Sequence, residues 1–222
     1  MASKPVVILG GGGSGVIVAQ GIIDIAAAGG DLHALGFLND VVPQGSLIEG
    51  LPVLGKFENW RAFPDETLFI TAVHKPKEML ARARRISALE IPQSRLAVVL
   101  HPSALVAARV PIGPGSYIGP NAVIMPGARI GAHASLRAGC YVSHDVTVED
   151  LALIGPNATI SGRTQVGEGA HIGPNAGVRE DLSIGRFAVV GIGAVVVRDV
   201  PDLAIVIGNP AREVGKVGDG RE

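Results

Sequence analysis

An aliphatic residue recurs at every sixth position through the second half of the chain. The series runs without a gap through Leu100, Val106, Ile112, Ile118, Ile124, Ile130, Leu136, Val142, Val148, Ile154, Ile160, Val166, Ile172, Val178, Ile184, Val190 and Val196. Four residues after most of these anchors stands a small side chain, such as Ala122 or Cys140. A helix needs apolar residues about every 3.6 positions, and a half-buried strand needs them every second position. A period of six fits neither pattern.

Six residues are one short strand and one corner, so three repeats predict a triangular coil of about 18 residues. Successive coils then stack at the spacing of paired strands, about 4.8 Å. We expect the anchors and the small residues to point into this prism. Little room remains there for aromatic side chains, which make up only 4% of the chain. The 31 glycines are expected mostly at the corners, where a positive φ is often needed.

Strand and helix patterns alternate through the first hundred residues, which indicates a small α/β unit. The expected elements are strands at Pro5–Leu9, His33–Leu38 and Leu68–Val73, a helix that follows the glycine loop and ends near Ala28, and a helix at Lys77–Leu89. The spacing Gly10-x-Gly12-x-x-Gly15 fits the dinucleotide fingerprint, in which a helix N-terminus binds an anion. Only about ninety-five residues precede the prism, enough for one mononucleotide half. The loop therefore favours a nucleotide or nucleotide sugar, and a tight turn without ligand is the alternative.

The overall properties exclude several classes of protein. A net charge of −1 leaves no basic footprint for nucleic acid. The single cysteine, Cys140, forbids an intrachain disulfide, suits a reducing cytosol and is expected in inert core. The apolar stretch Val6–Ala28 is interrupted by glycines and Asp24, so we reject a signal peptide, and no other stretch is long enough for a membrane span. We expect a cytoplasmic protein with no membrane partner and no metal.

His144 is the strongest catalytic candidate, because Asp145 follows it and it lies two residues after the anchor Val142. Eighteen residues later, Gly162 occupies the equivalent corner of the next coil. An imidazole can take a proton near neutral pH, a carboxylate can fix its tautomer, and an approachable backbone N–H can stabilise an oxyanion. Spacing alone fits a corner histidine without function equally well. Three other histidines are expected to be structural or exposed: His101 at the prism junction, and His133 and His171 at corner or outward positions.

These features occur in an order that resembles one known family over nearly the whole chain. The motifs are the glycine-loop α/β unit, Leu100-His-Pro-Ser-Ala104, the hexads, Ser143-His-Asp145, Ile160-Ser-Gly162 and Gly208-Asn-Pro-Ala-Arg212. The family is the hexapeptide-repeat acyltransferases, specifically the bacterial sialic-acid O-acetyltransferase and UDP-4-amino-sugar N-acetyltransferase group. The resemblance implies a left-handed parallel β-helix, acetyl-CoA as donor, and a homotrimer with active sites between neighbouring prisms. We expect a Rossmann-like nucleotide-sugar-binding domain at residues 1–97 and the acyltransferase β-helix with a C-terminal tail at residues 98–222.

The resemblance also assigns roles to individual residues. It implies His144 as general base with Asp145 in support, Gly162 as donor to the thioester carbonyl, Pro174 and Ile192 beside the pantetheine, Gly12, Gly13 and Ser14 against the nucleotide sugar, and Asn39 and Asp40 near its base. Three positions depart from the family pattern. Ser14 replaces a common histidine, Thr71–Lys75 replaces a Gly-Asn segment, and Leu153 stands where some members carry a second histidine near the coenzyme.

The sequence-based hypothesis is therefore acetyl transfer from acetyl-CoA to an amino or hydroxyl group of a sugar, with a UDP-linked 4-amino sugar as the favoured acceptor. Direct attack on the bound thioester requires only a base, so no covalent enzyme intermediate is expected. Two alternatives stay open from the residues themselves. One is a catalytically inactive binding or scaffold protein that keeps the prism, and the other is a nicotinamide-dependent enzyme.

Overall fold

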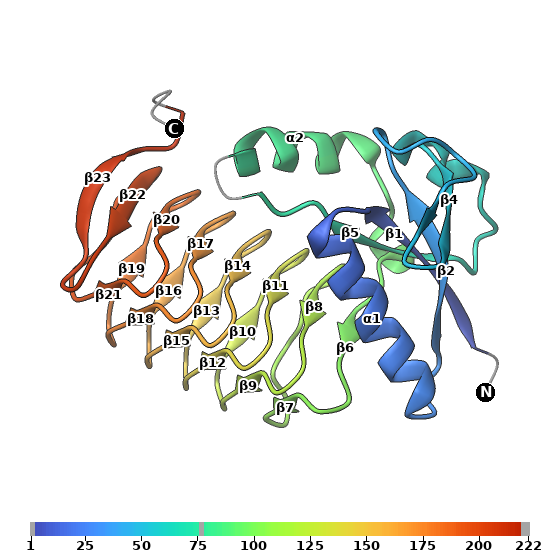
Figure 1. Cartoon of the computed structure of the whole chain (residues 1–222). Coiled ribbons are helices and arrows are strands. Elements are labelled where there is room, and N and C mark those ends of the chain that lie inside the picture. Colours follow the sequence, from blue (N-terminus) through green and yellow to red (C-terminus); the bar gives the residue numbers. More distant parts are fainter. Residues whose placement is uncertain (1–2, 76–77, 219–222) are drawn as a thin grey trace.

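The structure of the chain is a computed structural model that describes residues 3–75 and 78–218. An α/β unit lies against the first coils of a long triangular prism built from stacked strands (Figure 1). The fold is thus an α/β N-terminal half-domain followed by a parallel β-helix, as the spacing predicted, and it is of the left-handed type that the family resemblance implied.

The α/β unit has a five-stranded sheet with the strand order β3-β4-β2-β1-β5. Its elements are β1 (Lys4–Gly10), α1 (Gly13–Ala27), β2 (Leu32–Leu38), β3 (Leu47–Ile48), β4 (Leu51–Gly55), the 3₁₀ helix η1 (Phe57–Ala62), β5 (Leu68–Ala72), α2 (Met79–Leu89) and the 3₁₀ helix η3 (Gln93–Arg95). The predicted strands and the first helix are confirmed to within a residue or two. The predicted start of the second helix, Lys77, lies outside the described residues. The β3–β4 hairpin and η1 were not predicted.

Strand β1, which lies between β2 and β5 in this sheet, is buried on both faces. Residues 6–9 of β1 are fully buried, as expected for a parallel strand covered on two sides. Val6 and Ile8 pack with apolar residues of α1, whereas Val7 and Leu9 pack with Trp60. The glycine loop between β1 and α1 is therefore held at a fixed edge of the sheet.

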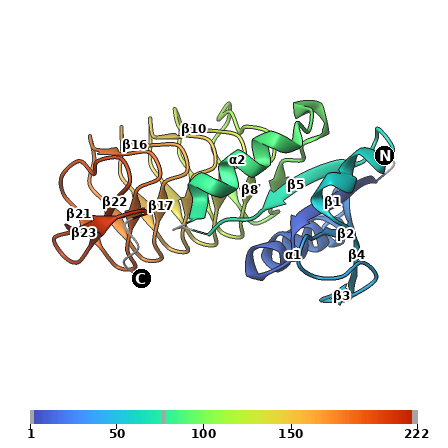
Figure 2. The ribbon, with the colours of Figure 1, turned by 90° about the horizontal axis from the view of Figure 1, so that it is seen from above.

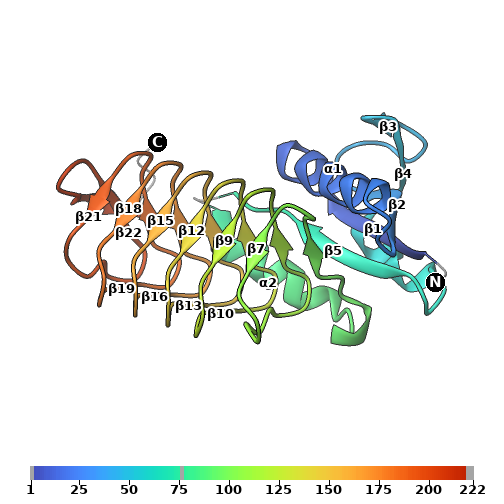
Figure 3. The same ribbon diagram turned by 90° about the horizontal axis from the view of Figure 1, so that it is seen from below.

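Most of the prism is formed by two-residue parallel strands whose partners lie eighteen residues apart, such as Ser135 opposite Leu153, and it ends in a longer antiparallel pair of strands. Its strands are β6 (Val99–Leu100), β7 (Leu105–Val106), β8 (Tyr117–Ile118), β9 (Val123–Ile124), β10 (Arg129–Ile130), β11 (Ser135–Leu136), β12 (Tyr141–Val142), β13 (Thr147–Val148), β14 (Leu153–Ile154), β15 (Thr159–Ile160), β16 (Gln165–Val166), β17 (His171–Ile172), β18 (Gly177–Val178), β19 (Ser183–Ile184), β20 (Val189–Val190), β21 (Val195–Val196), β22 (Ala204–Ile207) and β23 (Arg212–Lys216). They form three sheets, and Figure 3 shows one face with β7, β9, β12, β15, β18 and β21 stacked in order.

The anchors fill the prism from Ile118 onward, where each is at most 4% exposed. The small positions are buried with them, and Cys140 is fully buried. Burial raises the pKa of the Cys140 thiol to about 12, so this cysteine is inert core, as expected. The first coil is different: Leu100 is 40% exposed, because no earlier coil covers that end of the prism. The expectation that every anchor is buried is wrong there.

A positive φ recurs at the corners of the prism more regularly than the sequence predicted. Every sixth residue from Arg109 to Gly193 has a positive φ, and this set includes Leu151 and Phe187 as well as glycine, Asn and Asp. The glycine directly after an anchor has another task. At Gly155, an added Cβ would lie 2.7 Å from the backbone nitrogen of Pro174 in the next coil. The positive φ that the sequence predicts at the corner glycines therefore occurs two residues after the glycine that follows an anchor. The glycines after the anchors instead permit the close stacking of neighbouring coils.

Several contacts fix the α/β unit on the prism, among them one at each of its two α-helices. Helix α2 lies along the prism (Figure 2), and Met79 packs with Leu151 and Phe187, which lie two coils apart on the same corner. At the junction, His101 Nε2 lies 3.1 Å from Asp24 Oδ2 on α1. This bond confirms the structural role predicted for His101.

Candidate functional site

His144 and Asp145 form the turn that follows β12, and their side chains are hydrogen-bonded. Nδ1 of His144 lies 2.9 Å from Oδ2 of Asp145, whose φ of 58° belongs to the repeating corner geometry. An ionised carboxylate only accepts, so the imidazole donates through Nδ1 and keeps a lone pair on Nε2. The two side chains are 52% and 61% exposed, so Nε2 is open to a ligand.

Gly162 lies directly beside this imidazole in the next coil. A Cβ placed on Gly162 would come 2.7 Å from both Cε1 and Nε2 of His144. The eighteen-residue spacing thus brings the two residues together, as the sequence predicted, and only glycine leaves room for the ring. The next residue, Arg163, donates its backbone N–H to the His144 carbonyl at 3.1 Å. Its guanidinium forms a double hydrogen bond with Asp181 at 2.6 Å for each contact.

Gly162→Ala should impair catalysis while leaving the fold intact. The added methyl group must displace the ring of His144, the general base that the family resemblance implies, and misplacing such a group by about 1 Å can cost on the order of 10²-fold in rate. Steady-state kinetics and a melting curve check this expectation. Gly177→Ala is the matched control, because a Cβ there meets no atom within 4 Å and its φ is not positive. An active Gly162→Ala variant with the kinetics of the Gly177→Ala variant would contradict the assigned geometry.

Pro174 and Ile192 lie on a different corner, which follows β17 and β20. Successive coils are in close contact there, since an added Cβ on Gly173 would lie 2.7 Å from the Ile192 backbone nitrogen. Ile192 is 73% exposed, a large apolar side chain with one face open. The structure therefore places these two residues together on a prism corner, apart from the corner of His144.

A cavity of about 550 Å³ opens at the edge of the α/β sheet. Every residue predicted to contact the nucleotide sugar lines it: Gly12, Gly13, Ser14, Asn39 and Asp40. The helix side supplies cations that the sequence prediction missed, among them Lys75, Arg82 and Arg85. The volume of this cavity is within the usual range for small-molecule binding sites. His144, Asp145 and Gly162 do not line this cavity within the single chain.

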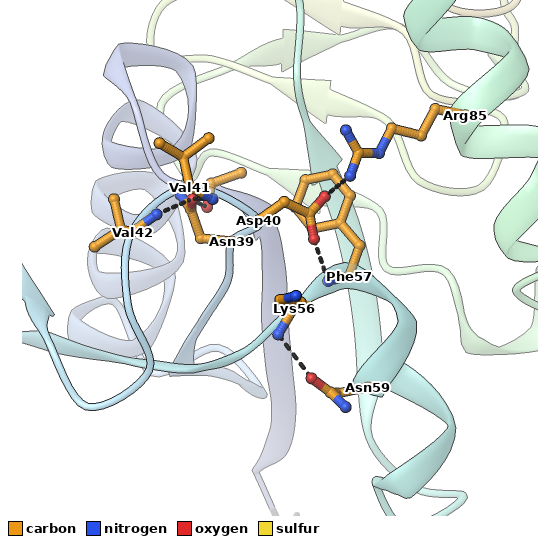
Figure 4. A network of polar contacts seen from close by, with 9 residues as sticks. Asn39, Asp40, Val41, Val42, Lys56, Phe57, Asn59 and Arg85 are labelled. Atoms are coloured by element: carbon orange, nitrogen blue, oxygen red, sulfur yellow. Dashed lines mark hydrogen bonds and ion pairs between the residues drawn. The ribbon is translucent and has the colours of Figure 1, made fainter.

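Asn39 and Asp40 are committed to internal hydrogen bonds (Figure 4). The amide oxygen of Asn39 accepts from Val41 N–H and Val42 N–H, and its Nδ2 donates to the Gly10 carbonyl at 3.1 Å. One Asp40 oxygen accepts from Phe57 N–H at 3.0 Å, while the other pairs with Arg85. These residues shape the cavity rim, and a ligand would meet an Asp40 charge that Arg85 already compensates.

Ser14 connects the glycine loop to the prism. Its hydroxyl oxygen accepts a hydrogen bond of 2.8 Å from Nη2 of Arg137, which is only 6% exposed.

Burial and the Arg137 charge lower the pKa of His74 to about 3 and that of His171 to about 4. Both histidines are therefore neutral at physiological pH.

His133 lies at a corner and His171 at the outward position of β17, as the sequence predicted, but both side chains are only partly exposed. His133 Nδ1 lies 3.0 Å from the Thr71 hydroxyl, and the His133 carbonyl lies 3.2 Å from His74 Nε2. Both contacts come from the segment Thr71–Lys75, where this chain departs from the family pattern. Burial lowers the pKa of both His133 and His171. The α/β unit thus covers a prism face that the repeat alone would leave in water.

In residues 3–75 and 78–218, no cluster of three or more His, Cys, Asp or Glu side chains could hold a metal ion. None of the helices within these ranges is long and apolar enough to cross a membrane.

The repeat and the whole fold both have known relatives. The family model described as bacterial transferase hexapeptide (six repeats) matches residues 109–144, 127–162 and 145–180. The acetyltransferase domain of PglB from Neisseria gonorrhoeae, solved in complex with acetyl coenzyme A, is 31% identical with a TM-score of 0.82, and the match covers 96% of this chain and 100% of that chain. The comparison with curated proteins gave no match.

Two other solved structures are similar over nearly their full length. A variant of perosamine N-acetyltransferase from Caulobacter crescentus, in complex with CoA and GDP-perosamine, is 28% identical with a TM-score of 0.83 and coverage of 97% of this chain and 99% of that chain. WeeI from Acinetobacter baumannii is 26% identical with a TM-score of 0.80 and coverage of 94% and 99%.

Proposed function

Because the chain belongs to the bacterial hexapeptide-repeat sugar acetyltransferases, we propose that it acetylates the amino group of a nucleotide-linked amino sugar with His144 as general base. The chain is an acetyl-CoA-dependent enzyme of this family. The proposal adds the acceptor and the residues that act on it. A UDP-linked 4-amino sugar is the favoured acceptor, and a GDP-linked one is next, since a relative was solved with GDP-perosamine.

The observation that carries the proposal is the His144–Gly162 pair. The acceptor nitrogen attacks the thioester carbonyl carbon, a C–N bond forms, and the C–S bond then breaks. His144 Nε2 takes the proton from the nitrogen, while Asp145 holds Nδ1. The Gly162 backbone N–H is proposed to donate to the carbonyl oxygen as it becomes negative. CoA leaves as the thiolate and is protonated to the free thiol.

The two parts of the chain supply the two binding functions in this proposal. Residues 1–97 hold the nucleotide sugar in the cavity beside Gly12, Gly13 and Ser14, with Asn39 and Asp40 at its rim. Residues 98–222 hold acetyl-CoA, with Pro174 and Ile192 beside the pantetheine. The single chain leaves both His144 and Ile192 exposed, which supports an active site closed by a neighbouring prism in a homotrimer.

A thiol-release assay with acetyl-CoA tests the proposal directly. The acceptor panel contains UDP- and GDP-linked 4-amino sugars, the matched 4-hydroxy sugars, and free sialic acid. We expect CoA release only with the amino sugars, with the mass of the product raised by one acetyl group. Release with the hydroxyl acceptors alone would replace N-acetylation by O-acetylation. No release with any acceptor would support a binding or scaffold protein instead.

A further inference from the structure

The prism corner that carries His144 continues as a column of residues through the neighbouring coils. Gly127, Asp145, Arg163 and Asp181 follow one another at intervals of eighteen residues, and each has a positive φ. Backbone hydrogen bonds join successive coils here, such as the one from Arg163 N–H to the His144 carbonyl at 3.1 Å. Neighbouring members of the column are therefore about one strand spacing apart, roughly 4.8 Å. Arg163 thus has an aspartate in the coil on each side of it.

Arg163 forms hydrogen bonds with only one of these two aspartates. Its Nε and Nη2 each donate to Asp181 at 2.6 Å, a double hydrogen bond of the strong charge-assisted kind. This hydrogen bonding is the main reason why the pKa of Asp181 is lowered and that of Arg163 is raised. Asp145 acts on Arg163 through its charge alone, and no hydrogen bond joins these two side chains in the part of the chain that the structure describes.

The carboxylate of Asp145 is instead committed to the imidazole of His144. Its Oδ2 accepts from His144 Nδ1 at 2.9 Å, and its Oδ1 lies against Gly127, where an added Cβ would overlap it. This single hydrogen bond keeps the proton on Nδ1 and the lone pair on Nε2, because the partner of one ring nitrogen decides which nitrogen is protonated. Two charge-assisted hydrogen bonds from a guanidinium are stronger than one from a neutral imidazole. A released Arg163 would therefore take the Asp145 carboxylate away from His144.

We propose that Asp181 is a positioning residue of the active site: it holds Arg163 away from Asp145 and so leaves that carboxylate free to orient His144. Asp181 acts through Arg163, because the side-chain hydrogen bonds that it accepts within residues 3–75 and 78–218 are the two that Arg163 donates. The inference rests on the proposed function only for the role of His144 as base. The tautomer of the imidazole can be measured without any substrate.

Nitrogen NMR of the histidine rings tests the proposal on the full chain, in slightly alkaline buffer where imidazole is neutral. The His144 signals, identified by their loss in His144→Ala, should show a protonated Nδ1 in the wild type. Asp181→Asn keeps the size of the side chain and tolerates a positive φ, and it should shift the proton toward Nε2. Asp181→Gly should do so at least as strongly. Arg163→Gln and the double variant Arg163→Gln/Asp181→Asn should keep the wild-type signals, because the competing guanidinium is gone.

With a competent acceptor, kcat should follow the tautomer. Asp181→Asn should lower kcat by about tenfold or more with little change in either KM, since Nε2 then lacks the lone pair that takes the proton. The double variant should recover to within about twofold of the wild-type kcat. A merely structural role of the Arg163–Asp181 pair predicts a double variant no better than Asp181→Asn. High salt should relieve the defect of Asp181→Asn, because it screens the attraction between the exposed charges of Arg163 and Asp145.

Glu180→Gln is the matched control, because Glu180 is an exposed carboxylate next to Asp181 that acts on Arg163 through its charge alone. This variant loses the same charge and should keep the wild-type signals and kcat. A wild-type Nδ1 signal in both Asp181→Asn and Asp181→Gly overturns the proposal, even if Arg163 then pairs with Glu180. An Nδ1 proton that is also lost in the double variant overturns it as well. A tautomer that responds as expected in a protein inactive with every acceptor supports this inference and rejects the proposed function.

Discussion

His144→Ala should lower kcat by about 10²–10⁴-fold, the usual contribution of a positioned general base. The imidazole is the group whose Nε2 faces Gly162 in the neighbouring coil, and Asp145 already holds its Nδ1. Without it, Asp145 stays at this corner, but a carboxylate is ordinarily a much weaker base than an imidazole for taking the proton from the attacking nitrogen. Steady-state kinetics with acetyl-CoA and the best acceptor from the panel measure the loss.

The fold should not change in this variant. His144 is half exposed and packs little, so the melting temperature should stay within the error of the wild-type value. His33→Ala is the matched control, because His33 lies on β2, and within residues 3–75 and 78–218 its side chain bonds only to Ser3, far from this corner. Full activity of His144→Ala on the true acceptor would contradict the mechanism, even if acetyl transfer itself were observed.

Ile154→Ala should destabilise the protein by about 2–5 kcal/mol, which corresponds to a melting temperature lower by on the order of 10 °C. Ile154 is an anchor in the middle of the prism and is fully buried. Removing most of its side chain leaves a cavity that rigid neighbouring coils cannot close, since their backbones already touch at Gly155.

Thr159→Ala provides the comparison, because Thr159 is the exposed residue of β15, the next strand along the chain. Denaturant or thermal unfolding of the two variants measures the difference. A loss for Ile154→Ala no larger than that for Thr159→Ala would show that the prism interior does not carry the stability of the fold.

The repeat made most of the prism predictable from sequence. A six-residue period fixes which side chains face inward, and the eighteen-residue coil places Gly162 beside His144 without any long-range information. The glycine loop and the strand before it, β1, could also be predicted from sequence, because the local spacing of residues determines both. Short-range sequence patterns are therefore enough to predict these elements.

The parts that were not predicted depend on contacts between distant segments. Arg137 and Ser14 are 123 positions apart, and no period links them. The burial of His133 and His171 follows from the α/β unit packing on one prism face, through Thr71 and His74. The positive φ of Leu151 is likewise imposed by stacking against local preference. The homotrimer and the acceptor remain proposals for the same reason, since other molecules complete both.

A crystal structure with CoA and the nucleotide-linked amino sugar would test the central claim most directly. The measured quantity is the distance from His144 Nε2 to the amino nitrogen of the sugar. The account predicts hydrogen-bond reach, about 3 Å directly or through one water, with the sulfur of CoA beside Gly162. An amino nitrogen bound out of reach of His144, with another side chain of the chain or its neighbour in contact with it, would contradict the account.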